Sequence, residues 1–454
     1  MKIPFWPEFK GFRDIDLGLD RMYQALERLD NPHKKLPKVI HIAGTNGKGS
    51  TLAFLRSIFE SANYKVHAYS SPHLVDFNER IYLAGKNIED DFLNKCLQIC
   101  KNACEQEPKI SLTFFEGATL AAFLAFSMVK ADIVILETGM GGRLDATNVL
   151  DEVMASIITP IAIDHAEFLG DNISDIAFEK AGIIKPNYLV ICGKQELEAL
   201  EVVKSRSDVL GCDFLNFQNS YDFKKTEGNW VFNCNFENKN NLSGYLQPKQ
   251  RELSLDYPKY LNQNHQLENL SNVIAFILTQ NHFKFSFAEI NHGICEAKWP
   301  ARLEKITSGK FYKKLQNETA GKNSELVIDG GHNPHAGEIV NQFLASKNDK
   351  FRIVLFSMLE DKDYQSYLFK IKDNVDLFIA CDIDNSVKAK SVDDICNFAK
   401  TTLHLNCIKS SLINSAIEEA IAFINKNNIE NSQILVCGSL YLAGNFKEQN
   451  NNYD

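Results

Sequence analysis

Residues 44–51, with the sequence GTNGKGST, carry the most recognisable chemistry in this chain. They lie between a short β-rich run and a stretch with helical periodicity. Glycines let backbone N–H groups approach phosphate oxygens closely, and the start of the following helix adds a positive dipole end. Lys48 can reach the β- and γ-phosphates of a nucleotide, and the hydroxyl of Ser50 or Thr51 can bind Mg²⁺. This context favours a phosphate site over a merely flexible loop, although Gly49 makes the spacing differ from the GxxxxGK[ST] of P-loop NTPases.

Four further polar clusters each have a plain structural interpretation when taken alone. They are residues 70–74 (SSPHL) with 79–81 (ERI), 113–116 (TFFE), 137–148 (ETGMGGRLDATN), and 164–165 (DH) with 179–182 (EKAG). Glu116 has the place of a capping carboxylate at a helix start, and His165 that of a buried, hydrogen-bonded histidine. The glycine cluster that begins after Glu137 follows a strand, and ligands bind open α/β sheets at the carboxyl ends of their strands.

The elements that must position these clusters are predicted to form a parallel sheet with helices on both faces. Near-continuous apolar runs separated by helical patterns predict such a sheet. The predicted strands of the first half are 38–43, 131–137, 154–159 and 188–192. We expect a small antiparallel β-region at about 195–264, a helix at 266–278, and then a second βα series with strands at 324–328, 351–356, 375–380 and 433–436. The fold class is therefore α/β, with an N-terminal domain at 1–297 and a smaller C-terminal domain at 298–454.

Composition restricts the classes of protein that fit this chain. It has 454 residues, which suggests more than one domain, and a net charge of −9, which argues against a nucleic-acid-binding face. Its most apolar stretch, 118–129, is too short to span a bilayer, and no signal segment is visible. The 11 cysteines contain no CxxC pair, as is usual in a reducing compartment. We expect a cytoplasmic monomer that binds neither membranes nor nucleic acid.

The motifs, taken together and in order, resemble the folylpolyglutamate synthase/dihydrofolate synthase family, whose members are relatives of the Mur ligases. The resemblance rests on GTNGKGS, SPHL with ERI, TFFEG, GMGGRLDATN, DH and EKAGIIK, and downstream on HQLEN at 265–269, WPAR at 299–302, DGGHNPH at 329–335 and VCGSLY at 436–441. It covers nearly the whole chain, from Ile15 to Gly444. It implies a Mur-ligase-like fold, with a P-loop-type parallel-sheet ATPase domain followed by a Rossmann-like α/β domain.

The resemblance implies a ligase that forms an amide bond in two steps. ATP phosphorylates a carboxylate to give an acyl phosphate and ADP, and the amine of L-glutamate then displaces phosphate. Two anions must approach each other, so Mg²⁺ ions and cationic side chains would neutralise them while the enzyme positions the reactants. The match to IDLG at 15–18 favours the bifunctional form, which acts on dihydropteroate and on tetrahydrofolate.

The same resemblance implies roles for particular residues of the first domain. Those that would hold the ATP phosphates are Gly47, Lys48, Gly49 and Ser50. Those that would hold Mg²⁺, with two ions expected, are Ser50, Ser71, Glu116 and His165. Those that would bind the pteroate are Asp16, Leu17 and Gly18. The family often carbamylates the lysine that matches Lys180, but an unmodified lysine facing phosphate is the alternative.

Other roles fall on the end of the first domain and on the second. Asn269, Arg302 and Asp329 match nucleotide contacts, and His332 and Ser439 match residues that bind the incoming glutamate. We expect the catalytic groups to be Lys48, Lys180 and His332. The chain departs from the family pattern at Ala301, where glycine is usual, and at Gly331, where alanine is usual, and both exchanges are between small residues.

Three other functions remain as alternatives. A Mur-type amino-acid ligase of cell-wall synthesis would share the ATP chemistry, but SPHL and GGRLDATN favour folate. A GTPase or ATPase switch would have a different loop spacing and a base-reading NKxD motif. A binding protein without activity would be expected to have lost some of the matched residues.

Overall fold

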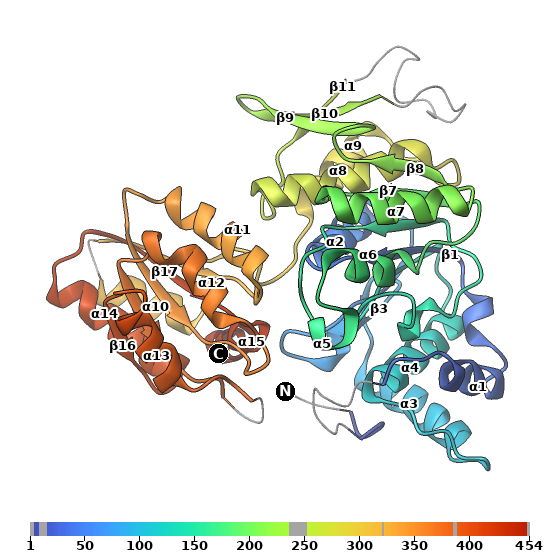
Figure 1. The fold of residues 1–454 in the computed structure, drawn as a ribbon, viewed down its shortest axis with the longest axis horizontal. Helices are drawn as coiled ribbons and strands as arrows, with labels where there is room; N and C mark the ends of the chain where they lie inside the picture. The colour runs from blue at the N-terminus through green and yellow to red at the C-terminus, as the bar shows by residue number, and fades with distance from the viewer. Residues whose placement is uncertain (1–3, 9–15, 236–251, 320–321, 385–387, 452–454) are drawn as a thin grey trace. The chain divides into compact units, whose positions relative to one another are not determined.

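The computed structural model describes residues 4–8, 16–235, 252–319, 322–384 and 388–451. The chain forms two compact units, Met1–Trp299 and Pro300–Asp454 (Figure 1). The division falls beside the Trp-Pro pair, close to the expected domain boundary between residues 297 and 298. Each unit has its own sheet and its own hydrophobic core.

The first unit is built on an eight-stranded sheet with the order β4-β3-β2-β5-β1-β6-β7-β8. Its strands are β1 (Lys38–Ala43), β2 (Val66–Tyr69), β3 (Ile81–Leu83), β4 (Lys86–Asn87), β5 (Ile133–Glu137), β6 (Ala155–Ile158), β7 (Leu189–Cys192) and β8 (Asp213–Asn216). All neighbours from β2 to β8 in this order are parallel, which confirms the predicted parallel sheet. Strands β3 and β4, at one end of the sheet, pair antiparallel, and β2, β3 and β4 were not predicted.

Helices cover both faces of this sheet because its strands are apolar on both faces. In β5, Ile133 and Ile135 belong to one core cluster, whereas Val134 and Leu136 belong to another. The first cluster includes α2 (Lys48–Ser61), α8 (Asn264–Thr279) and α9 (Phe287–Glu296). The opposite face carries α1 (Asp20–Arg28), α3 (Asp90–Cys104), α4 (Phe114–Met128), α6 (Ile173–Ala181) and α7 (Leu197–Val209), with the single turn α5 (Ala166–Leu169) and the short 3₁₀ segments η1 (Pro32–Lys35), η2 (Phe77–Arg80) and η3 (Ala146–Asn148).

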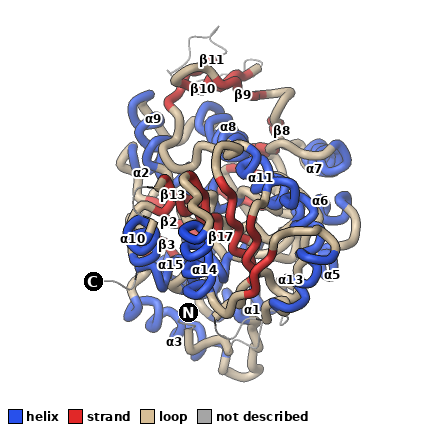
Figure 2. Tube along the Cα trace, turned by 90° about the vertical axis from the view of Figure 1, so that its left-hand side faces the viewer, coloured by secondary structure: helices blue, strands red, loops and turns tan. Residues whose placement is uncertain are grey.

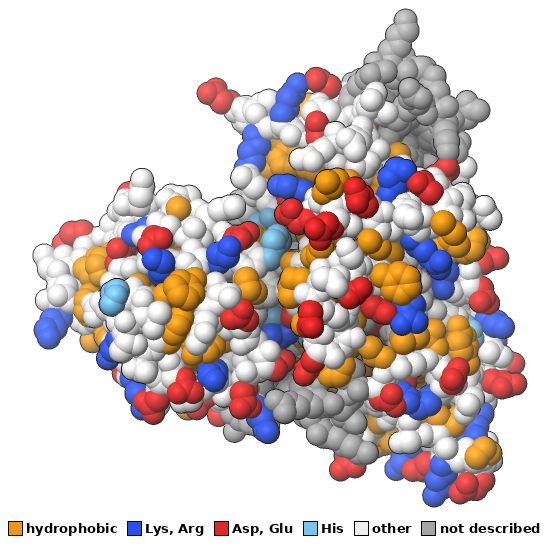
Figure 3. All heavy atoms as spheres, viewed as in Figure 1, with side chains coloured by type: hydrophobic (Ala, Val, Ile, Leu, Met, Phe, Trp, Pro, Cys, Tyr) orange, Lys and Arg blue, Asp and Glu red, His pale blue; other side chains and the backbone are white. Residues whose placement is uncertain are grey.

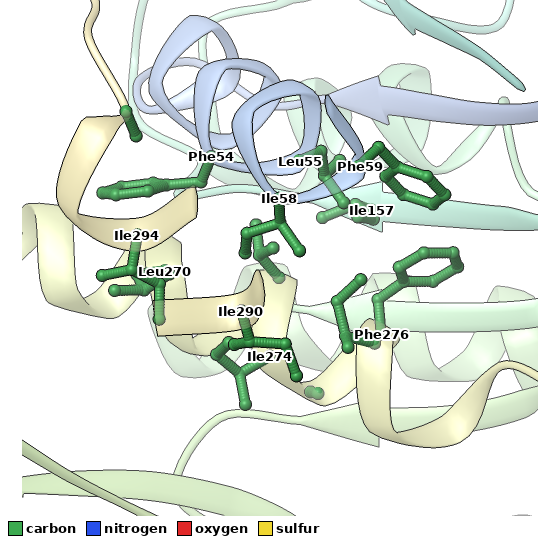
Figure 4. Close-up of a cluster of buried hydrophobic side chains, with 14 of the residues drawn as sticks. Phe54, Leu55, Ile58, Phe59, Ile157, Leu270, Ile274, Phe276, Ile290 and Ile294 are labelled. Atoms are coloured by element: carbon green, nitrogen blue, oxygen red, sulfur yellow. The ribbon is translucent and has the colours of Figure 1, made fainter. Parts of the chain in front are cut away.

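The helix that follows the glycine-rich loop, α2, is held in place by close packing. Figure 4 shows its side chains Phe54, Ile58 and Phe59 directed toward α8 and α9. Helix α9 approaches closely at Gly293, where a Cβ atom would lie 2.5 Å from the Cα of Ile58. The start of α2 is therefore fixed by a dense core below it rather than by the loop alone.

A separate antiparallel sheet lies in the region predicted to be β-rich, but the predicted range of 195–264 was too wide. The sheet comprises β9 (Tyr221–Lys225), β10 (Asn229–Cys234) and β11 (Glu252–Asp256). Trp230, Phe232 and Leu255 are fully buried in the cluster that includes α8. The earlier residues form α7 and the parallel strand β8, because Ala199 and Val203 recur at helical spacing and pack on the main sheet.

The second unit has a six-stranded sheet with the order β12-β13-β17-β14-β15-β16. Its strands are β12 (Glu304–Ile306), β13 (Asn323–Ile328), β14 (Phe351–Phe356), β15 (Leu377–Ala380), β16 (Cys407–Lys409) and β17 (Asn431–Cys437). The four predicted strands are confirmed as β13, β14, β15 and β17, and only β12 is antiparallel.

Helices cover both faces of this second sheet as well (Figure 2). On one face lie α11 (Pro334–Ala345), α12 (Tyr364–Ile371), which continues into η4 (Lys372–Asn374), and α13 (Val392–Thr401). The others, which contact one another, are α10 (Lys310–Glu318), α14 (Ile413–Lys426) and α15 (Leu440–Asn451).

The surface has the mixture of charges that is usual for a solvated protein. Figure 3 shows basic and acidic side chains interspersed over the visible face of each unit. In the described part of the chain, no helix is both long enough and apolar enough to cross a membrane.

Candidate active site

The loop between β1 and α2 has a geometry that requires glycine. Gly47 caps α2 with a φ of 90°, a left-handed conformation that favours glycine. A Cβ atom on Gly47 would also lie 2.4 Å from Oδ1 of Asn269 on α8. Asn269, a predicted nucleotide contact, therefore borders the loop. Gly49 is similarly close to Trp299, whose Nε1 would lie 2.5 Å from an added Cβ.

Several buried polar atoms of this loop lack a hydrogen-bond partner. Ser50 and Thr51 are at most 1% exposed, and their hydroxyl oxygens have no partner among the described residues. The same is true of Oδ1 of Asn269. Buried polar groups are usually hydrogen-bonded, so unpaired atoms in the first turn of α2 and on the neighbouring α8 fit a site that binds a ligand or ion. The donor set fits a phosphate group with a hard cation beside it.

Two lysines meet at one backbone carbonyl of the loop. Lys48 Nζ and Lys180 Nζ each lie 3.0 Å from the carbonyl oxygen of Gly44 and donate to it. Lys180 is 4% exposed, and burial together with the nearby charge of Lys48 lowers its pKa from 10.5 to about 7, although Asp164 and Asp145 oppose that shift. A substantial fraction of Lys180 is therefore a neutral amine near pH 7.

The carboxylate that faces the loop is Glu137, which the sequence reasoning did not select. Glu137 ends β5, is 5% exposed, and its Oε1 lies 4.0 Å from Lys48 Nζ. The available signal was its position as the last residue of a buried apolar strand that precedes a glycine cluster. In an open α/β sheet, that is where ligand-binding groups are found.

Glu116, the predicted metal ligand, has a different role in the structure. Its Oε1 accepts hydrogen bonds from Arg21 at 3.2 Å and 3.0 Å, and its Oε2 accepts one from the backbone N–H of Thr113 at 2.7 Å. With Thr113 it forms a capping box at the start of α4. A carboxylate engaged by an arginine and a helix cap has little capacity left for a cation. The structure thus assigns Glu116 to helix capping and leaves Glu137 as the carboxylate beside the loop.

The order of the strands places the remaining candidates in a row. Strands β2, β5, β1 and β6 are consecutive neighbours in the sheet. Their C-terminal ends lead to Ser71, Glu137, the 44–51 loop and His165, respectively. His165, predicted to be a metal ligand, has a φ of 53° and a side chain that is 35% exposed, so it is not the buried histidine that was the alternative interpretation.

In the described residues, three or more His, Cys, Asp or Glu side chains nowhere converge on a ready-made metal cage. Mg²⁺ is usually held by one or two carboxylates together with phosphates and water. The row of Ser71, Glu137 and His165 beside a phosphate loop therefore suits a cation that arrives with a nucleotide better than a permanently bound structural ion.

A small cavity marks part of the predicted pteroate site. It has a volume of about 360 Å³ and is lined by Asp16, Arg21, Gln24 and residues 109–113. Arg21 also donates a hydrogen bond of 2.7 Å to the backbone carbonyl of Asp16. Leu17 and Gly18 do not line this cavity, so of the three predicted pteroate residues only Asp16 faces it.

In the second unit, Asp329 organises the turn after β13. Its Oδ1 accepts from Gly331 N–H at 2.8 Å, and its Oδ2 accepts from Leu303 N–H at 3.0 Å. Burial raises the pKa of Asp329, although the neighbouring charge of Arg302 opposes that shift. The Arg302 guanidinium lies close to Gly330, 3.0 Å from where a Cβ would stand. Arg302 and Asp329, both predicted nucleotide contacts, are thus neighbours.

The two predicted glutamate-binding residues follow neighbouring parallel strands. His332 lies beyond the end of β13 and Ser439 beyond the end of β17, and these strands pair directly. Ser439 is 1% exposed and accepts a hydrogen bond from Tyr441 N–H at the start of α15. Both residues therefore stand at helix starts on the same edge of the sheet, which favours an anionic ligand.

Two family models match segments of the chain, one in each unit. The Mur ligase middle domain matches residues 42–276, and the C-terminal domain of dihydrofolate synthetase matches residues 312–448. The dihydrofolate synthase/folylpolyglutamate synthase of Bacillus subtilis is 30% identical over 452 residues, covering 95% of this chain and 94% of that protein. This chain belongs to the dihydrofolate synthase/folylpolyglutamate synthase family.

Solved structures of the family superimpose on nearly the whole chain. Escherichia coli FolC in complex with DHPP and ADP has a TM-score of 0.81 at 28% identity, and covers 96% of this chain and 94% of its own. The bifunctional enzyme of Yersinia pestis, complexed with AMPPNP and a Mn ion, has a TM-score of 0.79 at 27% identity with the same coverage. The predicted Mur-ligase-like fold is thereby confirmed, and the cell-wall Mur ligases are more distant relatives.

Proposed function

We propose that this protein is an ATP-dependent ligase that joins L-glutamate to dihydropteroate and, in further rounds, to tetrahydrofolate. The observation that carries the proposal is the row of groups along β2, β5, β1 and β6, in which a phosphate loop lies between Glu137 and His165. Family members of nearly the same length are named for both synthase activities. The reaction forms an acyl phosphate and ADP, and then an amide and phosphate.

In this proposal the loop and its lysine neutralise the charge that accumulates during phosphoryl transfer. Gly47 and Gly49 bring backbone N–H groups to the phosphates, and Lys48 places a cation beside them. Ser50 would hold one Mg²⁺ ion, and Ser71, Glu137 and His165 would hold a second; the ions would supply positive charge that lowers the repulsion between the nucleotide phosphates and the substrate carboxylate. The Mn ion and AMPPNP bound by the Yersinia enzyme support a divalent cation that is shared with the nucleotide.

Lys180 is proposed to carry a carbamate in the active enzyme. Only a neutral amine adds to CO₂, and the pKa of about 7 supplies that form near neutral pH. The nitrogen forms a bond to carbon and releases one proton, so the side chain becomes an anion. The adjacent Lys48, which shares the Gly44 carbonyl, would stabilise that anion.

The other substrates are assigned to the remaining predicted residues. Asn269, Arg302 and Asp329 would each contribute to nucleotide binding. His332 and Ser439 would bind L-glutamate. Asp16, with Leu17 and Gly18, would bind the pteroate, and the cavity beside Arg21 supports that place for Asp16.

We assign ATP binding to the domain at 1–297 and the glutamate site to the domain at 298–454. We further propose that the protein acts in the cytoplasm as a monomer, without nucleic-acid or membrane partners.

The decisive experiment offers labelled L-glutamate, ATP and Mg²⁺ with dihydropteroate or tetrahydrofolate in parallel. Product from both acceptors is the expected result. Product from tetrahydrofolate alone would remove the dihydropteroate activity and the role of Asp16. Product from neither, in the presence of measurable ATP binding, would contradict the proposal, and a UDP-sugar peptide would then be tested as the acceptor of a Mur-type ligase.

A further inference from the structure

A chain of hydrogen bonds runs from the middle of β1 to the glycine-rich turn after Glu137. His41 Nε2 lies 2.8 Å from the hydroxyl oxygen of Thr147, and that hydroxyl donates to Oδ1 of Asp145 at 2.5 Å. His41 and Thr147 are fully buried, and Asp145 is 3% exposed. Hydrogen bonds between groups buried this deeply make the structure around them more rigid.

The direction of each bond in this chain follows from the chemistry of its members. The Thr147 hydroxyl has one proton and gives it to Asp145, so it can only accept from His41. Nε2 of His41 therefore carries the hydrogen. Burial lowers the pKa of His41 to about 3, so the ring is neutral and its Nδ1 bears a lone pair, which has no partner among the described residues.

The second oxygen of Asp145 controls the turn itself. Its Oδ2 accepts the backbone N–H groups of Gly139 and Met140, each at 2.9 Å. These two residues follow Glu137 almost directly in the chain. Fixing the carboxylate of Asp145 therefore fixes the path of the backbone as it leaves the strand that ends in Glu137.

The same turn contacts α6, the helix that carries Lys180. Arg143 N–H donates to the carbonyl of Glu179 at 2.7 Å, and a Cβ on Gly142 would lie 2.9 Å from that oxygen. The contact leaves no room for a side chain on Gly142. A displacement of the turn would therefore be transmitted to α6 and to the lysine at its end.

We propose that His41 is a positioning residue. It orients the Thr147 hydroxyl toward Asp145 and thereby fixes the backbone turn that follows Glu137 and contacts α6. The effect on turnover rests on the proposed ligase function. The rigidity of the turn does not rest on that function, because it is a property of the protein without substrate.

Hydrogen exchange of the backbone tests the proposal directly. His41→Leu removes the donor, whereas His41→Gln keeps an N–H near the position of Nε2. In the full-length protein, we expect the amides of a peptide covering residues 138–144 to exchange at least about tenfold faster in His41→Leu than in wild type, and close to the wild-type rate in His41→Gln. The matched control is His67→Leu. His67 is also fully buried, on β2, but its Nε2 bonds to the carbonyl of Val129, so this variant should leave the peptide protected.

Turnover gives a second, independent measurement. If the catalytic groups are displaced in His41→Leu, kcat should fall by on the order of 10- to 100-fold, with little change in the KM for ATP. The His41→Leu/Thr147→Val double variant should be no worse than the more impaired single variant, because both changes break one chain of bonds. If His41→Leu fails to fold, Thr147→Val against Thr147→Ser makes the same comparison.

Unchanged protection of residues 138–144 in His41→Leu and Thr147→Val would overturn the proposal, as would additive losses of kcat in the double variant. Loss of protection without any glutamate incorporation in wild type would keep the structural role of His41 and instead contradict the proposed function.

Discussion

Lys48 and Lys180, which come from different helices, donate to the same carbonyl oxygen, that of Gly44. Two ammonium groups at one acceptor repel each other, and that repulsion adds to burial in lowering the pKa of Lys180. The phosphate loop is thus tied to the helix that carries EKAG, and the positive charge of Lys48 disfavours the charged form of Lys180.

The stability of the protein should depend on pH through Lys180. An unfolded lysine keeps its proton up to about pH 10.5, whereas the folded one loses it near pH 7. Between these values unfolding takes up a proton, so the free energy of unfolding contributed by this group should rise with pH, by at most about 1.4 kcal/mol per unit. In CO₂-free buffer, the stability advantage of Lys180→Met over wild type should therefore shrink from pH 7 to pH 9. A constant difference in denaturant unfolding would contradict the lowered pKa.

Bicarbonate should activate the enzyme, because carbamylation consumes the neutral amine. Glutamate incorporation should fall in CO₂-depleted buffer and recover when bicarbonate is added, more completely at pH 8 than at pH 6. A ¹³C-carbamate signal that is absent from Lys180→Met would assign the adduct. Full activity of Lys180→Met would show that no carbamate is needed.

Replacement of Lys48 should abolish phosphoryl transfer and leave the fold intact. Its side chain is 15% exposed and points to the loop carbonyls rather than into the core, so Lys48→Ala should lower Tm little. We expect turnover to fall by at least about 100-fold, the size of effect typical of lost electrostatic stabilisation. Lys86→Ala, at an exposed lysine paired with Glu89, is the control. Near-normal turnover of Lys48→Ala would mean that the loop is misassigned.

The two candidate carboxylates can be separated by paired amide substitutions. Glu137→Gln should weaken Mg²⁺-dependent binding of AMPPNP and raise the Mg²⁺ concentration that gives half-maximal turnover. Glu116→Gln should instead lower stability by about 1–3 kcal/mol, because a part-buried bond to Arg21 loses its charge, with a smaller effect on the Mg²⁺ response. The reverse pattern would restore Glu116 as the metal ligand.

The glutamate assignment predicts a selective effect in the second unit. His332→Ala should raise the KM for L-glutamate by about tenfold or more and leave the affinity for AMPPNP unchanged. Ser439→Ala should do the same and also cost about 1 kcal/mol of stability, since Ser439 accepts the Tyr441 N–H at a helix start. An equal loss of nucleotide affinity in both variants would move these residues to the ATP site.

The sequence predicted the parallel strands well, because buried parallel strands are apolar along their whole length and β5 is a clear example. It missed β2, and it also missed β3 and β4, which have only three and two residues and are too short to carry a pattern. It extended the small antiparallel sheet over α7 and over the parallel strand β8, where aromatic and polar residues alternate at residues 214–217. Strand order, which brings the ends of β2, β5, β1 and β6 together, could not be read from spacing alone.

The phosphate loop could be predicted because its chemistry lies within eight consecutive residues. The capping place of Glu116 could be predicted as well, but its pairing with Arg21 could not, since Arg21 is 95 positions away in the chain and the pairing depends on how two helices pack. Glu137 and His41 were missed for the opposite reason. They belong to strands, and in the sequence they look like the polar interruptions of ordinary core segments.

The small sheet of β9, β10 and β11 limits which segments of this enzyme can be deleted or exchanged for those of a relative. Trp230, Phe232 and Leu255 rest on α8, and Tyr221 bonds to Asn272 of that helix, one turn beyond the asparagine that abuts Gly47. Deleting the sheet to obtain a minimal ATP-binding domain would expose an apolar face of α8. It would also loosen the packing of α8 against the nucleotide loop. Grafts and recombination crossovers that separate residues 221–256 from α8 should therefore yield aggregated protein, and a shuffled library should recover only those that inherit both together.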